Sequence, residues 1–405
     1  MKACKLVLHA FFLSARGKCV FSSSMQSRFL LLILLSVCLR TTASDSLVTA
    51  LLQRVAALQV KQYDAFPAGA FPSYRAYALN QRIEKADVNP FFTGLIVFTL
   101  DKFRHQFNPG QKAIADKIMR DALPMFKKFE SPNHPHIYNY WPTDTVRVFP
   151  NGGWLNWFDK KHSLANDLDD TVILLMAMNS DSSIAAYVHN YMQAFVNTPQ
   201  RPILNTKKHL AGLGAYSTWF GVKMPIDFDI CVLSNVLYFV QSYQLKWTQA
   251  DSATLQVLTH AIDQKDYLTD GAYVSPHYEK PAIFLYHLAR LMSVKPIPVL
   301  EERKAQLIEQ AKTLLDKTHS PMEGILLSTA LLRWGQDPAS LRTIEIQSLS
   351  KDIEDADFSF FIANMASFLP APWKRIIGNS RIGYFRYYCP AYNYVLLLEY
   401  LMLNR

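Results

Sequence analysis

Three aspartates stand within four residues of the chain, at Asp167, Asp169 and Asp170, directly before an apolar run of helical length. Carboxyl groups crowded into a poorly hydrated place cannot all ionise, so one of them stays protonated and can act as a general acid. A second pair, Asp227 and Asp229, precedes another apolar run at an offset of 227 − 167 = 60 residues. The spacing therefore predicts a carboxylate-centred site assembled from distant parts of the chain.

The same aspartates could also be ordinary helix caps. A carboxylate at a helix start accepts hydrogen bonds from the free N–H groups of the first turn and suits the helix dipole. For any single one of them, capping is the better interpretation. Capping does not explain three aspartates in four residues, so Asp169, with Asp167 and Asp170 beside it, remains the candidate catalytic group.

Large aromatic residues precede the same apolar runs. They are dense in the segment 131–165 and recur in 212–219 and 271–278. They could fill the space as core, or they could line a pocket for an apolar or sugar-like ligand. The candidate ligand-binding residues are Asp227, Asp229, Tyr140, Trp141, Trp154, Trp157, Tyr216, Trp219, His277, Tyr278 and Glu279. His277 could be a catalytic base or a hydrogen-bonded histidine without a chemical role.

Two kinds of segment alternate along the chain and would position these residues. Segments that are apolar nearly all round predict helices buried on every side, at 91–100, 171–178, 231–240, 282–292, 324–334, 358–369 and 391–403. Amphipathic segments predict outer helices, at 46–62, 111–129, 183–196 and 300–318. This alternation predicts an all-α protein, an α/α toroid of helical hairpins with apolar inner and amphipathic outer helices. The starts of the inner helices would then converge at one mouth of the ring.

At Asp167-Leu-Asp169-Asp-Thr171 the sequence resembles the class II terpene cyclases, whose Asp-X-Asp-Asp motif is typically followed by Thr and an apolar inner helix of an α/α barrel. The resemblance covers only the residues around this motif. It implies that Asp169 protonates an alkene or epoxide of an isoprenoid, that Asp167 and Asp170 orient it, and that aromatic faces stabilise the resulting carbocations. The Gln-and-Trp repeats of the squalene-type members are absent, and the chain is long enough for one toroid where class II sites usually lie between two.

Two other classes of function fit the same residues. The α/α toroid is also the architecture of secreted glycoside hydrolases and polysaccharide lyases. In such an enzyme, Asp169 and either Asp229 or Glu279 would act as acid and base on a sugar bound across tryptophans. A non-catalytic exported binding protein would need only the pocket. Fold alone does not choose among these functions.

The first 43 residues predict a secretory leader. They hold six Lys and Arg and no acidic residue, an apolar run at 29–39 and small residues at 41–44. The run is too short to span a bilayer comfortably, although an uncleaved N-terminal anchor is the alternative, and Met25 offers a second start. We therefore expect a leader at 1–43, a single toroid domain at 44–405, a periplasmic or extracellular location, and a small-molecule ligand reached in solution or by peripheral contact with a membrane.

Composition excludes several other classes. The chain of 405 residues has a net charge of +9, of which six positive charges leave with the leader, so 9 − 6 = +3 remains and nucleic-acid binding loses its main support. The sequence has no zinc-type spacing, phosphate loop, dinucleotide fingerprint or Gly-X-Ser-X-Gly elbow. We expect no cofactor and no metal, because the aspartates also lack a glycine-turned calcium loop. Cys231 and Cys389 could pair or stay buried thiols.

Overall fold

The computed structural model describes residues 45–144, 166–200, 202–220, 227–338, 353–354 and 358–405. Residues 48–405 form one compact unit, which is the unit described below. A search of the described residues for a helix long and apolar enough to cross a membrane finds none. The predicted leader at 1–43 lies outside the described residues, so both its cleavage and the export of the chain stay predictions.

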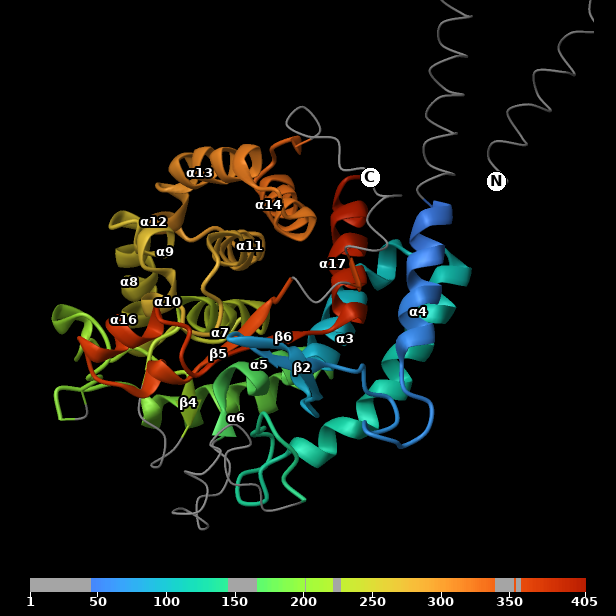
Figure 1. Ribbon diagram of the computed structural model, residues 1–405, viewed down its shortest axis with the longest axis horizontal. Helices are drawn as coiled ribbons and strands as arrows, with labels where there is room; N and C mark the ends of the chain where they lie inside the picture. Colours follow the sequence, from blue (N-terminus) through green and yellow to red (C-terminus); the bar gives the residue numbers. More distant parts are fainter. Residues whose placement is uncertain (1–44, 145–165, 201, 221–226, 339–352, 355–357) are drawn as a thin grey trace, which may run out of the picture. The chain divides into compact units, whose positions relative to one another are not determined.

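Six apolar helices of the described chain form a closed ring. They are α3 (Phe91–Phe103), α5 (Leu168–Ala177), α7 (Ile230–Ser242), α11 (Pro281–Met292), α14 (Pro321–Arg333) and α17 (Pro390–Leu403). Each helix packs against the next one in this order, and α17 returns to pack against α3 (Figure 1). Nearly every residue in these helices is buried. The reason is geometric, since one side of each helix faces its ring neighbours and the other side faces outer helices or the centre. The predicted α/α toroid is confirmed.

Amphipathic helices pack on the outside of the ring. Residues 48–58 are helical, and α4 (Pro109–Ala122), α6 (Ser182–Met192), α8 (Gln249–Asp263) and α13 (Lys304–Lys317) follow along the chain. Of these, α4 packs on α3, α8 packs on α7, and α13 packs on α14. Helix α8 was missing from the sequence prediction. The shorter helices in the described part of the chain include η1 (Arg104–Gln106), η2 (Leu123–Phe129), η4 (Gln193–Phe195), η5 (Lys208–Leu210), α9 (Asp266–Thr269), α10 (Gly271–Val274), α12 (Pro298–Glu301), η7 (Met365–Phe368) and α16 (Trp373–Gly378).

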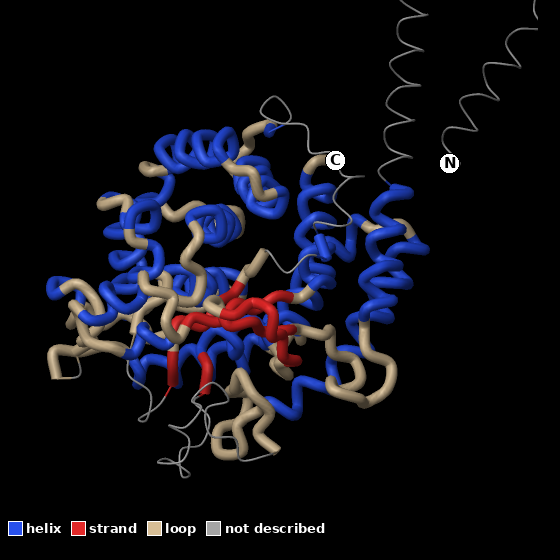
Figure 2. The backbone as a smooth tube through the Cα atoms, in the orientation of Figure 1, coloured by secondary structure: helices blue, strands red, loops and turns tan. Residues whose placement is uncertain are grey.

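An antiparallel sheet joins two parts of the chain that are far apart in sequence. Its order is β2 (Asn80–Ala86), β1 (Tyr74–Tyr77), β6 (Tyr384–Tyr388) and β5 (Phe361–Asn364). Figure 2 shows these strands gathered in one place among the helices. A second, very short pair joins β3 (Asn166–Asp167) to β4 (Trp219–Phe220) directly before α5. The sheet and this pair together bring β-structure to the starts of the inner helices.

The predicted inner helix at 358–369 is wrong. This segment contains strand β5 and the short helix η7 instead. Its buried residues alternate along β5, and the backbone N–H of Ile362 donates to the carbonyl oxygen of His277 at 2.9 Å. A short apolar run does not distinguish a strand from a buried helix, so only the pairing of β5 with β6 decides between them.

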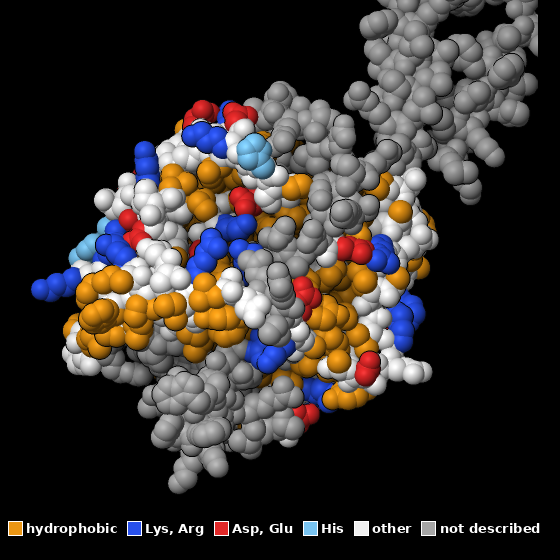
Figure 3. All heavy atoms as spheres, viewed as in Figure 1, with side chains coloured by type: hydrophobic (Ala, Val, Ile, Leu, Met, Phe, Trp, Pro, Cys, Tyr) orange, Lys and Arg blue, Asp and Glu red, His pale blue; other side chains and the backbone are white. Residues whose placement is uncertain are grey.

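One end of the unit exposes large apolar side chains. Trp373 and Ile376 on α16 are 57% and 60% exposed, and Ile382 after it is 59% exposed. Figure 3 shows hydrophobic side chains gathered over the place that α16 occupies in Figure 1. Exposed apolar patches often serve as contact surfaces. The expected peripheral contact with a membrane remains a prediction.

Candidate active site at the starts of the inner helices

The starts of α5 and α7 lie together because β3 and β4 pair. Asp167 is opposite Trp219 in this pair, and the N–H of Leu168 donates to the carbonyl oxygen of Thr218 at 3.1 Å. Asp167 caps α5, since its Oδ1 accepts from the N–H of Asp170 at 3.0 Å. The capping interpretation is therefore correct for Asp167, and the same backbone geometry places its carboxyl group at the mouth of the ring.

Asp229 caps α7 and ties another segment to it. Its Oδ1 accepts from the N–H groups of Cys231 and Val232 at 2.8 and 3.3 Å and from Ser275 Oγ at 2.7 Å. Its Oδ2 accepts from the N–H of His277 at 2.8 Å. Burial raises the pKa of Asp229 above its ordinary value, while the positive charge of His277 and these donors oppose the rise. With both oxygens occupied, Asp229 serves to hold the 275–277 segment at the mouth.

Asp169 is buried at the centre of this arrangement. Asn235 Nδ2, on α7, donates to its Oδ1 at 2.7 Å, and the Tyr278 hydroxyl, directly before α11, donates to its Oδ2. Burial raises the pKa of Asp169 to about 6, although these two hydrogen bonds oppose the rise. The middle aspartate of the motif is thus a carboxyl group that can hold a proton in weakly acidic conditions and that links α5, α7 and the segment before α11.

The two flanking aspartates also favour the protonated form. Burial, together with the negative charge of Asp169, raises the pKa of Asp167 to about 7. Asp170 is buried, neither of its carboxyl oxygens has a hydrogen-bond partner among the described residues, and burial raises its pKa well above the ordinary value. Because Asp167 and Asp170 are close, the ionisation of one disfavours that of the other. The pair therefore keeps at least one proton near neutral pH.

His277 faces a buried carboxylate. Its Nε2 lies 3.7 Å from Asp227 Oδ2, a distance that suits an ion pair but not a direct hydrogen bond. Burial alone would lower the pKa of His277, but Asp227, with Asp229 and Asp167 beyond it, outweighs burial and the pKa is raised. The Nδ1 atom has no hydrogen-bond partner within the described chain. A protonated His277 would therefore have an N–H to offer to a ligand.

These groups adjoin a small cavity, which we call the aromatic slot. Its volume is about 40 Å³, below the roughly 300–1,000 Å³ of typical small-molecule pockets. Phe361 forms part of its wall, and the Tyr140 ring stacks on it at a centroid distance of 5.6 Å and the His277 ring at 6.0 Å. The slot admits a small group or part of a larger ligand. Its walls are Tyr140, Trp141, Asp167, Trp219, His277, Phe361, Ala363, Asn364, Met365 and Tyr387.

The structure brings together most of the predicted site residues. Tyr140, Trp141, Asp167, Trp219 and His277 line the aromatic slot. The other members belong to the hydrogen-bonded and charged groups beside it, namely Asp169, Asp170, Asp227, Asp229 and Tyr278. Within the part of the chain that is described, no group of three or more His, Cys, Asp or Glu side chains is arranged to hold a metal ion.

Two of the predicted residues that the structure describes, Tyr216 and Glu279, are not in this assembly. The Tyr216 hydroxyl donates to Asp251 on the outer helix α8 at 3.0 Å, so Tyr216 packs between outer elements and not at the slot. Glu279 accepts from the Tyr384 hydroxyl and lines a separate small cavity beside β6. Trp154 and Trp157 lie outside the described residues.

Sequence reasoning missed the contribution of the sheet and of one inner-helix amide. Phe361 and Tyr387 come from β5 and β6, and Asn235 holds Asp169 from inside the apolar helix α7. The aromatic density around 358–361 and at 387–388 was a usable signal that these segments are buried. Nothing in the local pattern shows that they lie against Asp167, because only strand pairing puts them there.

Comparisons with known proteins add one structural similarity. No protein-family model matches the chain, and no curated protein sequence matches it. Among solved structures, the chain is similar to an unsaturated glucuronyl hydrolase specific for heparin, with a TM-score of 0.41 and 12% identity over 89% of this chain and 95% of that one. Similarity of fold does not transfer activity, so the function is argued below from the side chains alone.

Proposed function

We propose that the protein is a carbohydrate-active enzyme that cleaves a glycosidic bond by general acid catalysis, with Asp167 as the proton donor. The observation that carries the proposal is the position of Asp167, a carboxyl group whose pKa is raised to about 7 and which lines a slot walled by aromatic rings. Tyrosine and tryptophan combine an apolar face with a polar group, which suits the mixed surface of a sugar.

The acid–base properties of Asp167 suit both halves of such a reaction. A catalyst is most effective when its pKa lies near the working pH, because both of its forms are then populated. The protonated carboxyl group would give its proton to the glycosidic oxygen as the carbon–oxygen bond breaks. The resulting carboxylate would take a proton from the water molecule that replaces the departing sugar. Asp167 thereby regains the proton that it donated, and neither step requires a metal or a cofactor.

His277 would assist by binding and not by taking up a proton. Its raised pKa and the neighbouring Asp227 favour the imidazolium form, and its Nδ1 has no partner among the described residues. An imidazolium N–H on the wall of the slot would donate to a ligand oxygen and favour a negatively charged or electron-rich one. Because the slot is small, only the reacting end of a longer glycan would enter it.

The test compares two aspartate substitutions, one directly before α5 and one directly before α6. The native chain, Asp167→Asn and Asp181→Asn are incubated with neutral and uronate-containing oligosaccharides, and new reducing ends are measured. Asp181 is exposed and its side chain makes no capping hydrogen bond, so it is a matched control. We expect activity in the native chain and in Asp181→Asn, and a loss of at least 100-fold in Asp167→Asn. Equal activity in all three, or none in the native chain, would reject the proposal.

A second candidate is isoprenoid cyclisation by Asp169, as the Asp-X-Asp-Asp-Thr motif suggests. The observation in its favour is that Asp169 is buried beside aromatic rings with its pKa raised to about 6. Against it, Asp169 does not line the slot, and Asn235 and Tyr278 occupy its two oxygens.

To test this second candidate, the same variants, extended by Asp169→Asn, are incubated with lipid extracts. An isoprenoid product that disappears only with Asp169→Asn would support cyclisation over glycan cleavage. If the native protein changes neither the oligosaccharides nor the lipid extracts, both enzymatic proposals fail.

A further inference from the structure

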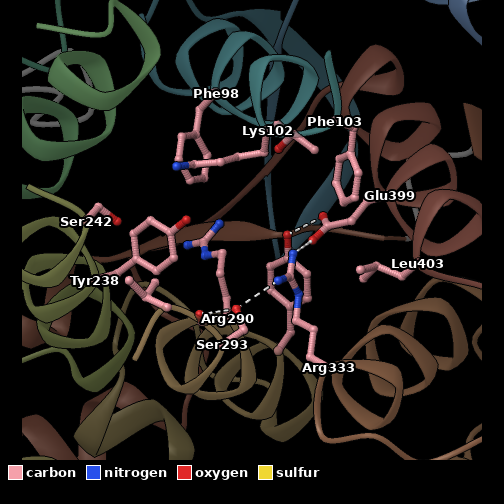
Figure 4. A pocket seen from close by; sticks show the side chains of 13 residues that line it. Phe98, Lys102, Phe103, Tyr238, Ser242, Arg290, Ser293, Arg333, Glu399 and Leu403 are labelled. Atoms are coloured by element: carbon pink, nitrogen blue, oxygen red, sulfur yellow. Dashed lines mark hydrogen bonds and ion pairs between the residues drawn. The ribbon is translucent and has the colours of Figure 1, made fainter. Parts of the chain in front are cut away.

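A larger cavity lies at the opposite ends of the inner helices, where no part of the proposed chemistry takes place. Its volume is about 320 Å³, within the roughly 300–1,000 Å³ of small-molecule pockets. Its walls come from the C-terminal halves of α3, α7, α11, α14 and α17, including Phe98, Tyr238, Tyr286, Arg290 and Glu399 (Figure 4). We call this cavity the cationic pocket because of the charges that follow.

Arg290 is the unusual residue of this pocket. Its side chain is only 3% exposed and points into the pocket. One guanidinium nitrogen, Nη2, donates to Asn235 Oδ1, whereas Nε and Nη1 have no hydrogen-bond partner and no carboxylate within ion-pair distance in the described chain. A buried charge normally has a counterion, because its desolvation is expensive. The missing counterion is the first sign of a ligand.

Burial lowers the pKa of Arg290 and the negative charge of Glu399 raises it from a distance, but Glu399 forms no direct ion pair with Arg290. Glu399 is already occupied, since Arg333 Nη2 approaches its Oε1 at 2.5 Å and the Tyr286 hydroxyl donates to its Oε2 at 2.6 Å. Lys102, at the rim, lies over the faces of Phe98 and Tyr238 and, like Arg290, has no carboxylate within ion-pair distance among the described residues. With one Glu against two Arg and one Lys, the walls carry a net charge of +2.

The walls could stabilise part of this charge without a ligand. Three aromatic rings, those of Phe98, Tyr238 and Tyr286, lie 5.4 to 5.5 Å from the Arg290 guanidinium carbon. The ends of the inner helices also contribute partial negative charge. Neither effect gives Nε and Nη1 an acceptor, so either water or an anion must satisfy them. The apolar walls favour an anion that carries an apolar portion.

We propose that the cationic pocket binds a small organic carboxylate. Its carboxylate group would accept hydrogen bonds from Arg290 and pair with Lys102, and its apolar part would pack on Phe98 and Tyr238. A bare inorganic phosphate fits less well, because it is strongly hydrated and would leave the aromatic walls uncovered. The pocket and the aromatic slot share no lining residue and lie at opposite ends of the inner helices. The proposal therefore does not rest on glycan cleavage.

A chain of hydrogen bonds connects this pocket to the other mouth of the ring. Arg290 donates to the side-chain oxygen Oδ1 of Asn235, Asn235 Nδ2 donates to Asp169 Oδ1, and the Tyr278 hydroxyl donates to Asp169 Oδ2. The positive charge of Arg290 lowers the pKa of Asp169. A bound carboxylate would neutralise that charge and so would raise the pKa of Asp169. Binding of a carboxylate at one end of the ring would thereby change the pKa of Asp169 at the other end.

The experiment uses benzoate and its neutral analogue benzamide as probes, with binding to the native chain measured by titration calorimetry. We expect benzoate to bind at least tenfold more tightly than benzamide, and more weakly as salt is added. Arg290→Gln should weaken benzoate binding at least tenfold. Lys102→Gln, at an exposed position that does not endanger folding, should weaken it severalfold, whereas Lys112→Gln on the outer helix α4 should leave it unchanged.

Four outcomes would overturn the proposal. They are no benzoate binding to the native chain, equal binding of benzoate and benzamide, binding that is unaffected by Lys102→Gln, and binding of inorganic phosphate but not of benzoate. A carboxyl resonance of Asp169 that titrates at the same pH with and without bound benzoate would refute the coupling between the two ends. Each readout is independent of any activity toward glycans.

Discussion

The pH dependence of folding offers a direct test of the buried Asp169. Its pKa is raised from 3.8 in a free aspartate to about 6 in the folded chain, so the folded state holds the proton more tightly than the unfolded state does. The contribution of Asp169 to stability is therefore fully present below the unfolded pKa and is lost as the pH rises through the folded one. A difference of about two pKa units corresponds to about 3 kcal/mol of unfolding free energy, nearly all of it lost by pH 7.

The substitution Asp169→Asn removes this titration and keeps the shape of the protonated group. An asparagine oxygen can accept from Asn235, and its N–H₂ can donate to the Tyr278 hydroxyl, which then turns its own hydrogen elsewhere. The variant should therefore gain stability relative to the native chain as the pH rises. Between pH 4 and pH 7 the difference in unfolding free energy should change by about 2–3 kcal/mol in favour of the variant.

The assay is urea unfolding at intervals of one pH unit, with the slope of free energy against urea compared between the proteins. Asp116→Asn is the matched control of opposite sign, because the hydrogen bond from Arg104 lowers the pKa of Asp116. That variant should lose stability relative to the native chain as the pH rises. A flat difference for Asp169→Asn, or one with the slope of the control, would refute the burial of an aspartic acid at this position.

Other substitutions test the local geometry. Asp229→Ala removes the acceptor of four buried donors and should cost at least about 3 kcal/mol of unfolding free energy, measured by urea unfolding. Gly271→Ala would place a Cβ atom 2.2 Å from the carbonyl oxygen of Glu279, so we expect a lower melting temperature in calorimetry. Cys231 and Cys389 are buried free thiols, so alkylation followed by mass spectrometry should label both only after unfolding, and the label should not require a reductant.

The apolar helices of the ring were predictable because a helix buried on every side has apolar residues on all of its faces, which the sequence shows directly. The runs at 91–100, 171–178 and 231–240 each became an inner helix, with α5 starting at the Asp167 motif as expected. The starts of α11 and α14 were predictable from local sequence, since each begins with a proline, which favours the first turn of a helix. The free thiols were not predictable, because spacing in sequence does not show whether two cysteines meet.

The local sequence pattern led to wrong predictions where the structure of a segment depends on the residues that pair or pack with it. The run at 358–369 looked like a seventh inner helix, yet it became β5 because β6 lies beside it. Tyr216 was expected near the mouth on grounds of aromatic density, but the hydrogen bond to Asp251 draws it to the outer layer. The choice between strand and helix, and between slot and outer layer, depends on contacts with residues more than 20 positions away.

The sequence by itself determined the ring of helices and the carboxylates at their starts, because helical periodicity and capping act over a few residues. Only the tertiary structure decided which carboxyl group faces a cavity. Asp167 lines the aromatic slot, whereas Asp169 is held by Asn235 and Tyr278. Neighbouring residues on one helix differ in direction and burial, and the elements packed around them set both properties. The proton affinity of each aspartate is therefore a property of the assembled ring.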